Sequence, residues 1–506
     1  MPKSIDKQNK GRTAIVMGGS MAGLWTARVL ADHFDEVTIV ERDQLPSEPT
    51  HRPGVPQARQ YHILLRRGRQ IMQDLFPDLD KQLCAAGAIE ADLAKDVKVN
   101  LRGHWLKQFA SGHLLLSCSR VLLETAIRQR LASHPRVQFI EGAEVTGLRP
   151  QGSTLRRQGE GLTQAVTGIN VRWRDGSRGQ KGDQETLLAD FVVDATGRNS
   201  RTPKWLSELG YQAPEESVVN SFLGYATRRY KKPANWHADW DMMLISSTPP
   251  DQPRGGIIFA EENETWVVLL AGANKDYPPT DEEGFLAYAR SVTPEFYEAI
   301  SAAEPMTPIY GYRRTENQLR HYEKLTEWPE NFIVVGDAYC AFNPIYGQGM
   351  TVSAMTAVAL GEHLAQTNGN LSGFAHKFQQ HVAKLTQPVW LLATSADMQW
   401  PETVGAQRKS NVATRFAHWY LDQLMNALPH NDHIRLAFSD VNQLIQPVSS
   451  LFAPTVMARA LAHYLKTRLQ QATKPADRTP LLRVAGSLAG LLLATWLLKG
   501  MFATKP

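Results

Sequence analysis

A glycine-rich turn between two apolar runs constrains the fold of this chain more than any other feature. It lies in AIVMGGSMAGLWTARVL, residues 14–30, where a strand is predicted at 14–18 and a helix at 21–33. Gly18 and Gly23 occupy the first and third positions of a G-x-G-x-x-G pattern, where glycine allows the tight turn and close helix packing. Ser20 takes the second position, and its hydroxyl can donate to a phosphate at the helix N-terminus.

A second strand predicted at 36–42, EVTIVER, completes a β-α-β unit, the context in which this pattern indicates a nucleotide. Glu41 lies at the end of that strand, at the spacing expected of a carboxylate that accepts from ribose hydroxyls, and Arg42 follows it. Glycine-rich turns also occur without a ligand, but the β-α-β context and Glu41 favour a nucleotide-binding domain.

Length and composition restrict the remaining possibilities. A chain of 506 residues predicts two or three domains, and its 55 basic and 50 acidic residues are dispersed, which argues against nucleic-acid binding. The three cysteines are far apart, which excludes a disulfide framework or zinc ribbon, and no metal-ligand motif is present. The polar N-terminus lacks the apolar segment of a secretory signal, so we expect a cytoplasmic protein.

Two further strand-and-turn signatures occur far downstream. LLADFVVDATG, residues 187–197, is an apolar strand ending in a small-residue turn, and NFIVVGDAYCAFNPIYGQGM, residues 331–350, reads as strand, turn and helix. Between them, residues 206–325 alternate in polarity, with a hairpin predicted at 255–272, and the segment after 350 looks mainly helical to about 470. A sheet domain is therefore predicted between two cofactor-binding parts.

These signatures resemble those of FAD-dependent monooxygenases of the p-hydroxybenzoate hydroxylase fold, over roughly residues 11–400. With HRPGVPQARQYHILL (51–65) and FNPIYGQGM (342–350), the chain is most similar to the alkene epoxidases of polyether-antibiotic pathways such as monensin and lasalocid. Squalene epoxidases are more distant. The resemblance implies an α/β fold: a Rossmann-like FAD-binding domain of the glutathione-reductase type, an inserted β-sheet substrate domain and a C-terminal helical region.

The domain boundaries follow from the same comparison. We predict a discontinuous FAD-binding domain at 11–65, 115–205 and 330–380, and a substrate domain at 66–114 and 206–329. A C-terminal helical region is predicted at 381–470, followed by a hydrophobic tail at 481–503.

The resemblance also implies roles for individual residues. Asp337 would accept hydrogen bonds from the ribityl hydroxyls, and Arg120 would reach the phosphate or ribityl region. A backbone cradle beside the isoalloxazine would be formed by Pro344, Gly347 and Gly349. The alternatives are a helix N-cap for Asp337 and simple turn formation for the glycines. The remaining cofactor-binding candidates are Val145, at the adenine, and Gly197, in the middle signature.

No catalytic residue is assigned, and three candidates lie near the flavin. Arg59 and His62 occupy a loop that faces the flavin or its pyrophosphate in relatives, with an exposed basic loop as the alternative, and Tyr346 lies in the cradle turn. The middle signature reads Ala195-Thr196-Gly197, whereas single-component hydroxylases have D-G there. NAD(P)H is therefore expected as the electron source either directly or through a partner flavin reductase or electron-donor protein.

The expected chemistry is carried by the cofactor. Reduced FAD and O2 form a C4a-hydroperoxide that transfers one oxygen atom, so the protein needs to position a substrate and exclude water rather than supply an acid-base pair. Our first hypothesis is epoxidation of an alkene in a lipophilic polyene or terpenoid. The alternatives are aromatic or quinone hydroxylation, a flavin ene-reductase resembling geranylgeranyl reductases, and a non-catalytic, membrane-tethered electron carrier. Halogenation is disfavoured because no W-x-W-x-I-P motif is found.

The hydrophobic tail at 481–503 raises the possibility that the protein binds a membrane. Its uncharged core, VAGSLAGLLLATWLL (484–498), would rise about 22 Å as a helix, short of the roughly 30 Å hydrocarbon core of a bilayer. A C-terminal membrane anchor that holds a cytoplasmic enzyme near lipophilic substrates and a final buried helix both remain open.

Overall fold

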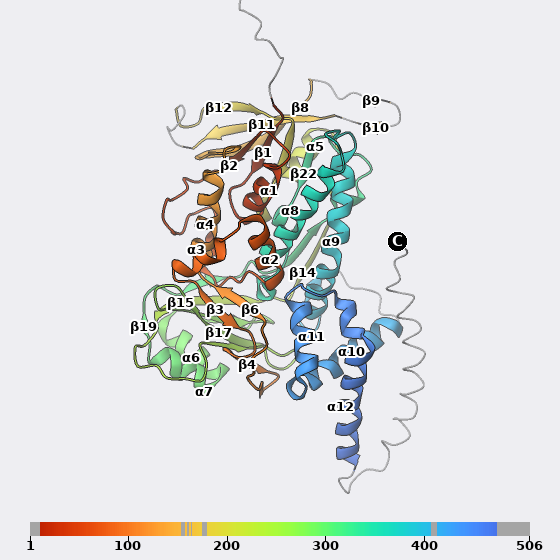
Figure 1. Cartoon of the computed structure of the whole chain (residues 1–506). Coiled ribbons are helices and arrows are strands. Elements are labelled where there is room, and N and C mark those ends of the chain that lie inside the picture. Colours follow the sequence, from red (N-terminus) through yellow and green to blue (C-terminus); the bar gives the residue numbers. More distant parts are fainter. Residues whose placement is uncertain are drawn as a thin grey trace, which may run out of the picture.

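The computed structural model describes residues 11–152, 157–158, 161–162, 164–174, 180–405 and 412–472 (Figure 1). Its first layer is a five-stranded parallel sheet in the order β22-β13-β1-β2-β7. These strands are β1 (Thr13–Met17), β2 (Glu36–Val40), β7 (Val137–Ile140), β13 (Phe191–Asp194) and β22 (Phe332–Val334). Their continuous apolar runs are typical of parallel strands buried on both faces. The sheet confirms the predicted Rossmann-like domain, assembled from segments far apart in the sequence.

Helices and a small antiparallel sheet cover this layer. The helices α1 (Met21–Leu30) and α8 (Gly349–Ala365) pack on each other, and α4 (Arg120–Ala132) packs on α1. At the top of Figure 1 lies the sheet of β8 (Ala143–Pro150), β11 (Val166–Trp173) and β12 (Gln184–Leu188). Two short strands, β9 (Arg157–Gln158) and β10 (Gly161–Leu162), pair with each other, and α5 (Thr202–Glu208) follows β13.

The predicted boundary at residue 66 does not coincide with the packing. Helices α2 (Arg66–Leu75) and α3 (Leu79–Ala85) pack against α8 and α4, respectively. Ile71, Met72 and Leu83 belong to the same buried cluster as the parallel sheet. These helices therefore extend the cofactor domain, because their apolar faces are buried against its core rather than against the second sheet.

The second layer is an eight-stranded, mostly antiparallel sheet in the lower left of Figure 1. Its central strands are β15 (Gly224–Lys231), β16 (Met242–Ile245), β17 (Arg254–Glu261) and β18 (Thr265–Gly272), and β17 and β18 confirm the hairpin predicted at 255–272. Its outer strands are β4 (Val97–Leu101), β5 (His104–Trp105), β19 (Glu304–Pro305) and β20 (Tyr310–Tyr312). Helices α6 (Glu282–Val292) and α7 (Pro294–Ser301) accompany it.

The two faces of this sheet have different neighbours. A Cβ built on Gly256 would lie 2.9 Å from the Phe296 ring, so Gly256 faces α7. Side chains alternate along a strand, so Ile257 and Phe259 face the other way. There, the rings of Phe259 and Tyr61 lie 4.7 Å apart, which places this face against the loop that leads into α2. The inner face of the sheet therefore adjoins the cofactor domain.

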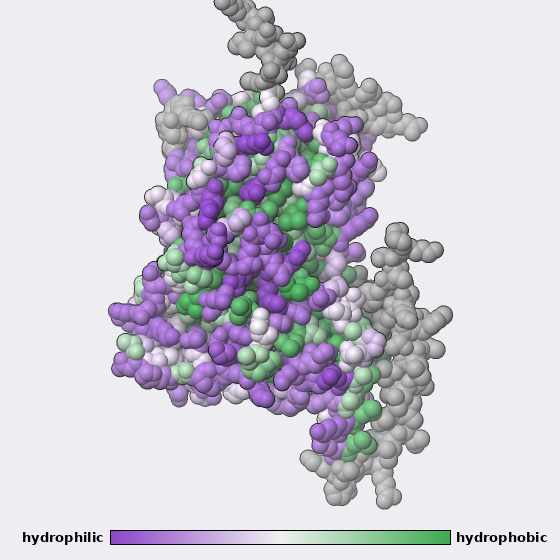
Figure 2. Space-filling model, viewed as in Figure 1, coloured by the Kyte–Doolittle hydropathy of each residue, from purple (hydrophilic) through white to green (hydrophobic). Residues whose placement is uncertain are grey.

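Short strands connect the two layers. They are β3 (Ile89–Asp92) with β6 (Leu114–Ser117), and a four-stranded sheet of β14 (Glu216–Asn220), β21 (Asn317–Arg320), β23 (Cys340–Ala341) and β24 (Val404–Gly405). Figure 2 shows polar residues over most of the face viewed, with apolar residues gathered near its middle.

The C-terminal helical region is also confirmed. It contains α9 (Phe374–Asp397), α10 (Val412–Ala427), α11 (Asp432–Asn442) and α12 (Pro454–Ala472), and the last three share a separate buried cluster. Within the part of the chain that the structure describes, no helix is long and apolar enough to cross a membrane. The predicted tail at 481–503 lies outside the described residues.

Candidate functional site

The fingerprint turn between β1 and α1 requires its two glycines. Gly18 has φ +104° and donates from its backbone N to the Val40 carbonyl at 2.8 Å. A Cβ on Gly23 would lie 1.9 Å from the Gly18 carbonyl oxygen, closer than any side chain allows. The helix therefore begins close enough to the strand for its first backbone N–H groups to approach an anion.

Ser20 is bound to two protein side chains. Its hydroxyl donates to Glu124 Oε2 at 3.0 Å and accepts from Arg120 Nη2 at 2.8 Å. As the residue before α1, it makes no side-chain capping bond. In this structure its hydroxyl thus orients Arg120, the residue predicted to reach the phosphate or ribityl region, rather than presenting a free donor.

Arg52 lies at the centre of a buried ion cluster beside this turn. Its guanidinium pairs with Glu124 at 2.8 Å, Glu41 at 3.0 Å and Asp43 at 3.2 Å. Glu41 Oε2 also accepts from the Gly19 backbone N at 2.9 Å. Although burial opposes ionisation, Arg120 and Arg52 lower the pKa of Glu124 to about 2. Three carboxylates thus surround the Arg52 guanidinium, and one of them, Glu124, also pairs with Arg120 at 2.7 Å.

Sequence reasoning missed Arg52, Asp43 and Glu124. Arg52 is separated from Glu124 by 72 residues and from Asp43 by 9, so no local spacing connects them. Two other cofactor-binding candidates from the sequence are Arg42 and Val145. Arg42 donates to the Gly54 carbonyl at 3.2 Å, and Val145 lies on β8 opposite Val171.

Asp337 lies at the end of β22, where Gly336 turns the chain with φ +61°. Its carboxylate accepts no hydrogen bond from any residue that the structure describes, and it caps no helix there. Burial raises its pKa, although Arg198, Arg120 and Arg320 oppose the shift. A Cβ on Gly349 would lie 3.7 Å from Asp337 Oδ1, so the carboxylate adjoins the start of α8. An unengaged carboxylate beside a glycine fits the hydroxyl-recognition role that the resemblance implies.

The predicted cradle turn lies next to the loop that holds His62. Pro344–Tyr346 form one 3-10 turn, and Gly347 follows with φ +65°. A Cβ on Gly347 would lie 2.7 Å from Ile63 Cγ2, so only glycine fits at this contact. The Tyr346 hydroxyl donates to Asp397 Oδ1 at 2.7 Å, which fixes it to α9.

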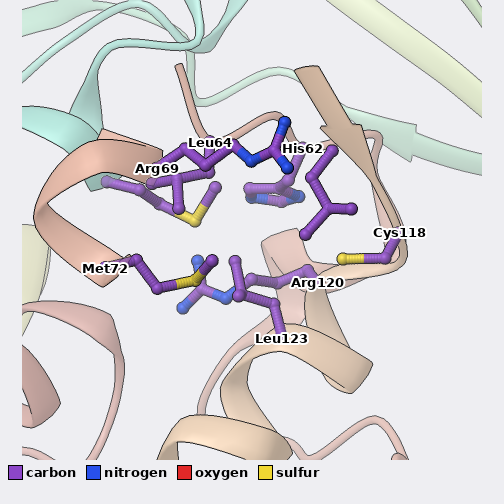
Figure 3. A pocket seen from close by; sticks show the side chains of 9 residues that line it. His62, Leu64, Arg69, Met72, Cys118, Arg120 and Leu123 are labelled. Carbon is purple, nitrogen blue, oxygen red and sulfur yellow. The ribbon is translucent and has the colours of Figure 1, made fainter. Parts of the chain in front are cut away.

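A small recess opens between these elements, and Figure 3 shows His62, Met72, Cys118 and Arg120 around one hollow. It is lined by His62, Leu64, Arg69, Met72, Leu116, Cys118, Arg120, Leu123 and Met350. A second small recess shares Arg120 and is also lined by Arg52 and Glu124. Arg120 thus lines both recesses.

The ring of His62 is uncharged at neutral pH. Burial, with a further contribution from Arg120, lowers its pKa to about 3, and its Nδ1 lies 3.0 Å from the Gln60 carbonyl oxygen. Arg59 is not brought into the recess, because its guanidinium stacks over the Tyr310 ring at 4.5 Å. In the middle signature, Gly197 turns the chain with φ +79°, and the buried Asp194 accepts from Thr196 N at 2.8 Å.

Replacing Ser20 by glycine, which restores the G-x-G-x-x-G pattern, is expected to lower stability slightly. The change removes two side-chain hydrogen bonds and should cost about 1 to 2 kcal/mol of unfolding free energy. Urea unfolding measures this, with Ser207→Gly at an exposed position of α5 as the control. An increase in stability would show that the hydroxyl contributes nothing to the placement of Arg120.

Comparison with known proteins agrees with this geometry. A family model described as "FAD binding domain" matches residues 12–373. Protein Rv3254 of Mycobacterium tuberculosis is 31% identical over 473 residues, covering 90% of this chain and 95% of that protein.

Solved structures of low sequence identity share the fold. A flavoprotein/dehydrogenase from Cytophaga hutchinsonii has a TM-score of 0.60 and the flavin-dependent brominase Bmp2 one of 0.58; each is 15% identical and covers 90% of this chain and 99% of its own. PqsL of Pseudomonas aeruginosa, a probable FAD-dependent monooxygenase, has a TM-score of 0.52 at 15% identity, covering 77% of this chain and 98% of its own. From the match over residues 12–373 and the sheet that carries its three signatures, we conclude that the chain belongs to the FAD binding domain family.

Proposed function

We propose that this chain is an FAD-dependent monooxygenase that transfers one atom of O2 to a lipophilic substrate, with epoxidation of an alkene as the reaction. The observation that carries the proposal is the position of the cradle turn. Gly347 packs on Ile63, and the neighbouring Tyr61 stacks on Phe259 of the inner sheet face. Apolar side chains of that face, Ile257 and Leu269 among them, are paired across β17 and β18. A flavin edge at this turn would therefore meet a largely apolar surface.

The residues of this chain would bind the cofactor and exclude water. The fingerprint turn would hold the pyrophosphate end, and Asp337 would accept from ribityl hydroxyls. Bound FAD would supply the electrons that activate O2, with one oxygen atom going to the substrate and the other to water. Two electrons per turnover would come from NAD(P)H, directly or through a partner reductase. Because His62 is neutral, it would serve as a hydrogen-bonding group rather than as a source of protons.

Isotope labelling tests the reaction type. Holoprotein would be supplied with 18O2, lipophilic polyenes, and NADPH with or without a flavin reductase, and the products analysed by mass spectrometry. Incorporation of one 18O atom across a former double bond is expected, with 18O-labelled water as the control. A saturated product without 18O would instead identify an ene-reductase, and incorporation into an aromatic ring would identify a hydroxylase.

Halogenation is tested in a separate experiment, because the brominase Bmp2 shares the fold. The same incubation with added bromide should give no brominated product. A brominated product formed at the expense of the epoxide would overturn the proposal.

A further inference from the structure

Asp397, the last residue of α9, is a carboxylate that is 1% exposed and lies outside every sequence motif. Its oxygens accept from Tyr346 Oη at 2.7 Å, Asn317 Nδ2 at 2.6 Å and Asn343 Nδ2 at 3.1 Å. Within the described ranges, no lysine, arginine or histidine forms an ion pair with it. Burial raises its pKa, and the hydrogen bond from Tyr346 is the largest effect that opposes the shift. A buried carboxylate that is stabilised only by uncharged hydrogen-bond donors costs folding free energy. The groups that it binds therefore indicate its role.

Two of these partners flank the cradle turn. Asn343 directly precedes Pro344, and Tyr346 directly precedes Gly347. The Asn343 side chain also accepts from the Ile345 backbone N at 3.2 Å, which caps the turn. Its backbone N donates to Asn317 Oδ1 at 2.7 Å, and Asn317 itself binds Asp397. One carboxylate thus holds both ends of the turn and the strand β21 beside it.

We propose that Asp397 is a positioning residue that fixes the Asn343–Gly347 turn against the flavin, linking the C-terminal helical region to the cofactor site. Asp397 lies in the C-terminal helical region, beyond the segment 12–373 that matches the family model. The inference rests on the predicted location of the isoalloxazine at this turn, and it is independent of the reaction that the flavin performs.

The test uses the full-length protein and three variants. Asp397→Asn keeps the size of the side chain but turns an amide NH2 group toward existing donors, and Tyr346→Phe removes only one of the hydrogen bonds. Thr394→Val is the matched control, because Thr394 is buried on the same helix but its hydroxyl donates only to the Trp390 carbonyl. For each protein we would measure the Kd of FAD for the apoprotein, the visible circular dichroism of bound flavin, and Tm.

Asp397→Asn is expected to weaken FAD binding about tenfold, as loss of a buried charge-assisted bond implies, and to change the visible circular dichroism. Tyr346→Phe should change the FAD affinity and the circular dichroism in the same direction, but by a smaller amount. Thr394→Val should lower Tm alone. If Asp397→Asn and Tyr346→Phe both kept the wild-type Kd and circular dichroism, Asp397 would be a structural residue and the inference would be wrong. If Asp397→Asn did not fold, the result for Tyr346→Phe would decide. Failure of the wild-type apoprotein to bind FAD would instead contradict the proposed function.

Discussion

The Asp337→Asn variant is expected to bind FAD about 10- to 100-fold more weakly while its apoprotein becomes more stable than the wild type. The loss of affinity corresponds to about 1.5 to 3 kcal/mol, the usual value of a hydrogen bond to a charged group. The gain in stability follows from the environment of the carboxylate. Asp337 accepts no hydrogen bond from the described residues, and burial raises its pKa. A partly buried carboxylate that accepts no hydrogen bond destabilises the fold in spite of the three nearby arginines, and the amide removes that cost.

The sign of the pH dependence follows from the same shift. Because the folded-state pKa of Asp337 is raised, its contribution is most favourable at low pH, where the carboxyl is protonated in both states, and is lost as pH rises through the folded pKa. The stability gain of Asp337→Asn should therefore be present at pH 7 and shrink toward pH 4. Differential scanning calorimetry of the apoproteins at both pH values, with fluorescence titration of FAD, measures the two effects.

Asp194 provides the contrast. It ends the neighbouring strand β13 as Asp337 follows β22, but its carboxylate accepts from Thr196 N at 2.8 Å, Thr196 Oγ1 at 2.6 Å and Thr202 Oγ1 at 2.6 Å. Asp194→Asn is expected to lower Tm at pH 7, opposite in sign to Asp337→Asn. An Asp337→Asn variant that lost stability like Asp194→Asn and bound FAD normally would show that Asp337 has a structural role.

The local parts of the site were predictable, and the long-range parts were not. Gly18, Gly23 and Asp337 follow strands whose apolar runs can be recognised in the sequence, and the structure places all three at the carboxyl edge of one parallel sheet. By contrast, Arg52 and Asp397 obtain their partners from distant segments, so neither is visible as a motif. Arg59 was a candidate because it lies in a basic loop. Its stacking on Tyr310, a residue distant in the sequence, could not be predicted from that position.

The packing of α2 and α3 could not be predicted for a similar reason. Helical periodicity indicates that a helix has an apolar face, but not which core buries that face. The apolar residues Ile71 and Met72 of α2 are compatible with either domain until the packing against α8 is known. Sequence patterns thus predicted the elements, whereas their assignment to a core required the three-dimensional arrangement.

Removing the guanidinium of Arg52 is expected to destabilise the folded protein strongly. Arg52→Ala would leave Glu41 and Asp43 without their shared buried cation and Glu124 with Arg120 alone. Breaking a buried ion pair on one side typically costs about 3 to 5 kcal/mol, because the remaining charge stays in a poorly solvated place. Urea unfolding at pH 7 measures this loss. FAD binding would fall as well, since the cluster lies beside the fingerprint turn.

The pH dependence distinguishes loss of this charge network from loss of packing. The folded-state pKa of Glu124 is lowered from 4.5 to about 2, so its ion pairs stabilise the wild type above pH 4.5 and progressively less as the pH falls toward 2. The difference between Arg52→Ala and the wild type should therefore be largest at pH 7 and shrink below pH 4.5. Arg174→Ala is the control: Arg174 reaches the same Asp43 at 3.8 Å, but its side chain is 50% exposed, so the change should cost less than about 1 kcal/mol. A deficit in Arg52→Ala that is independent of pH would mean that the Arg52 side chain contributes packing rather than charge.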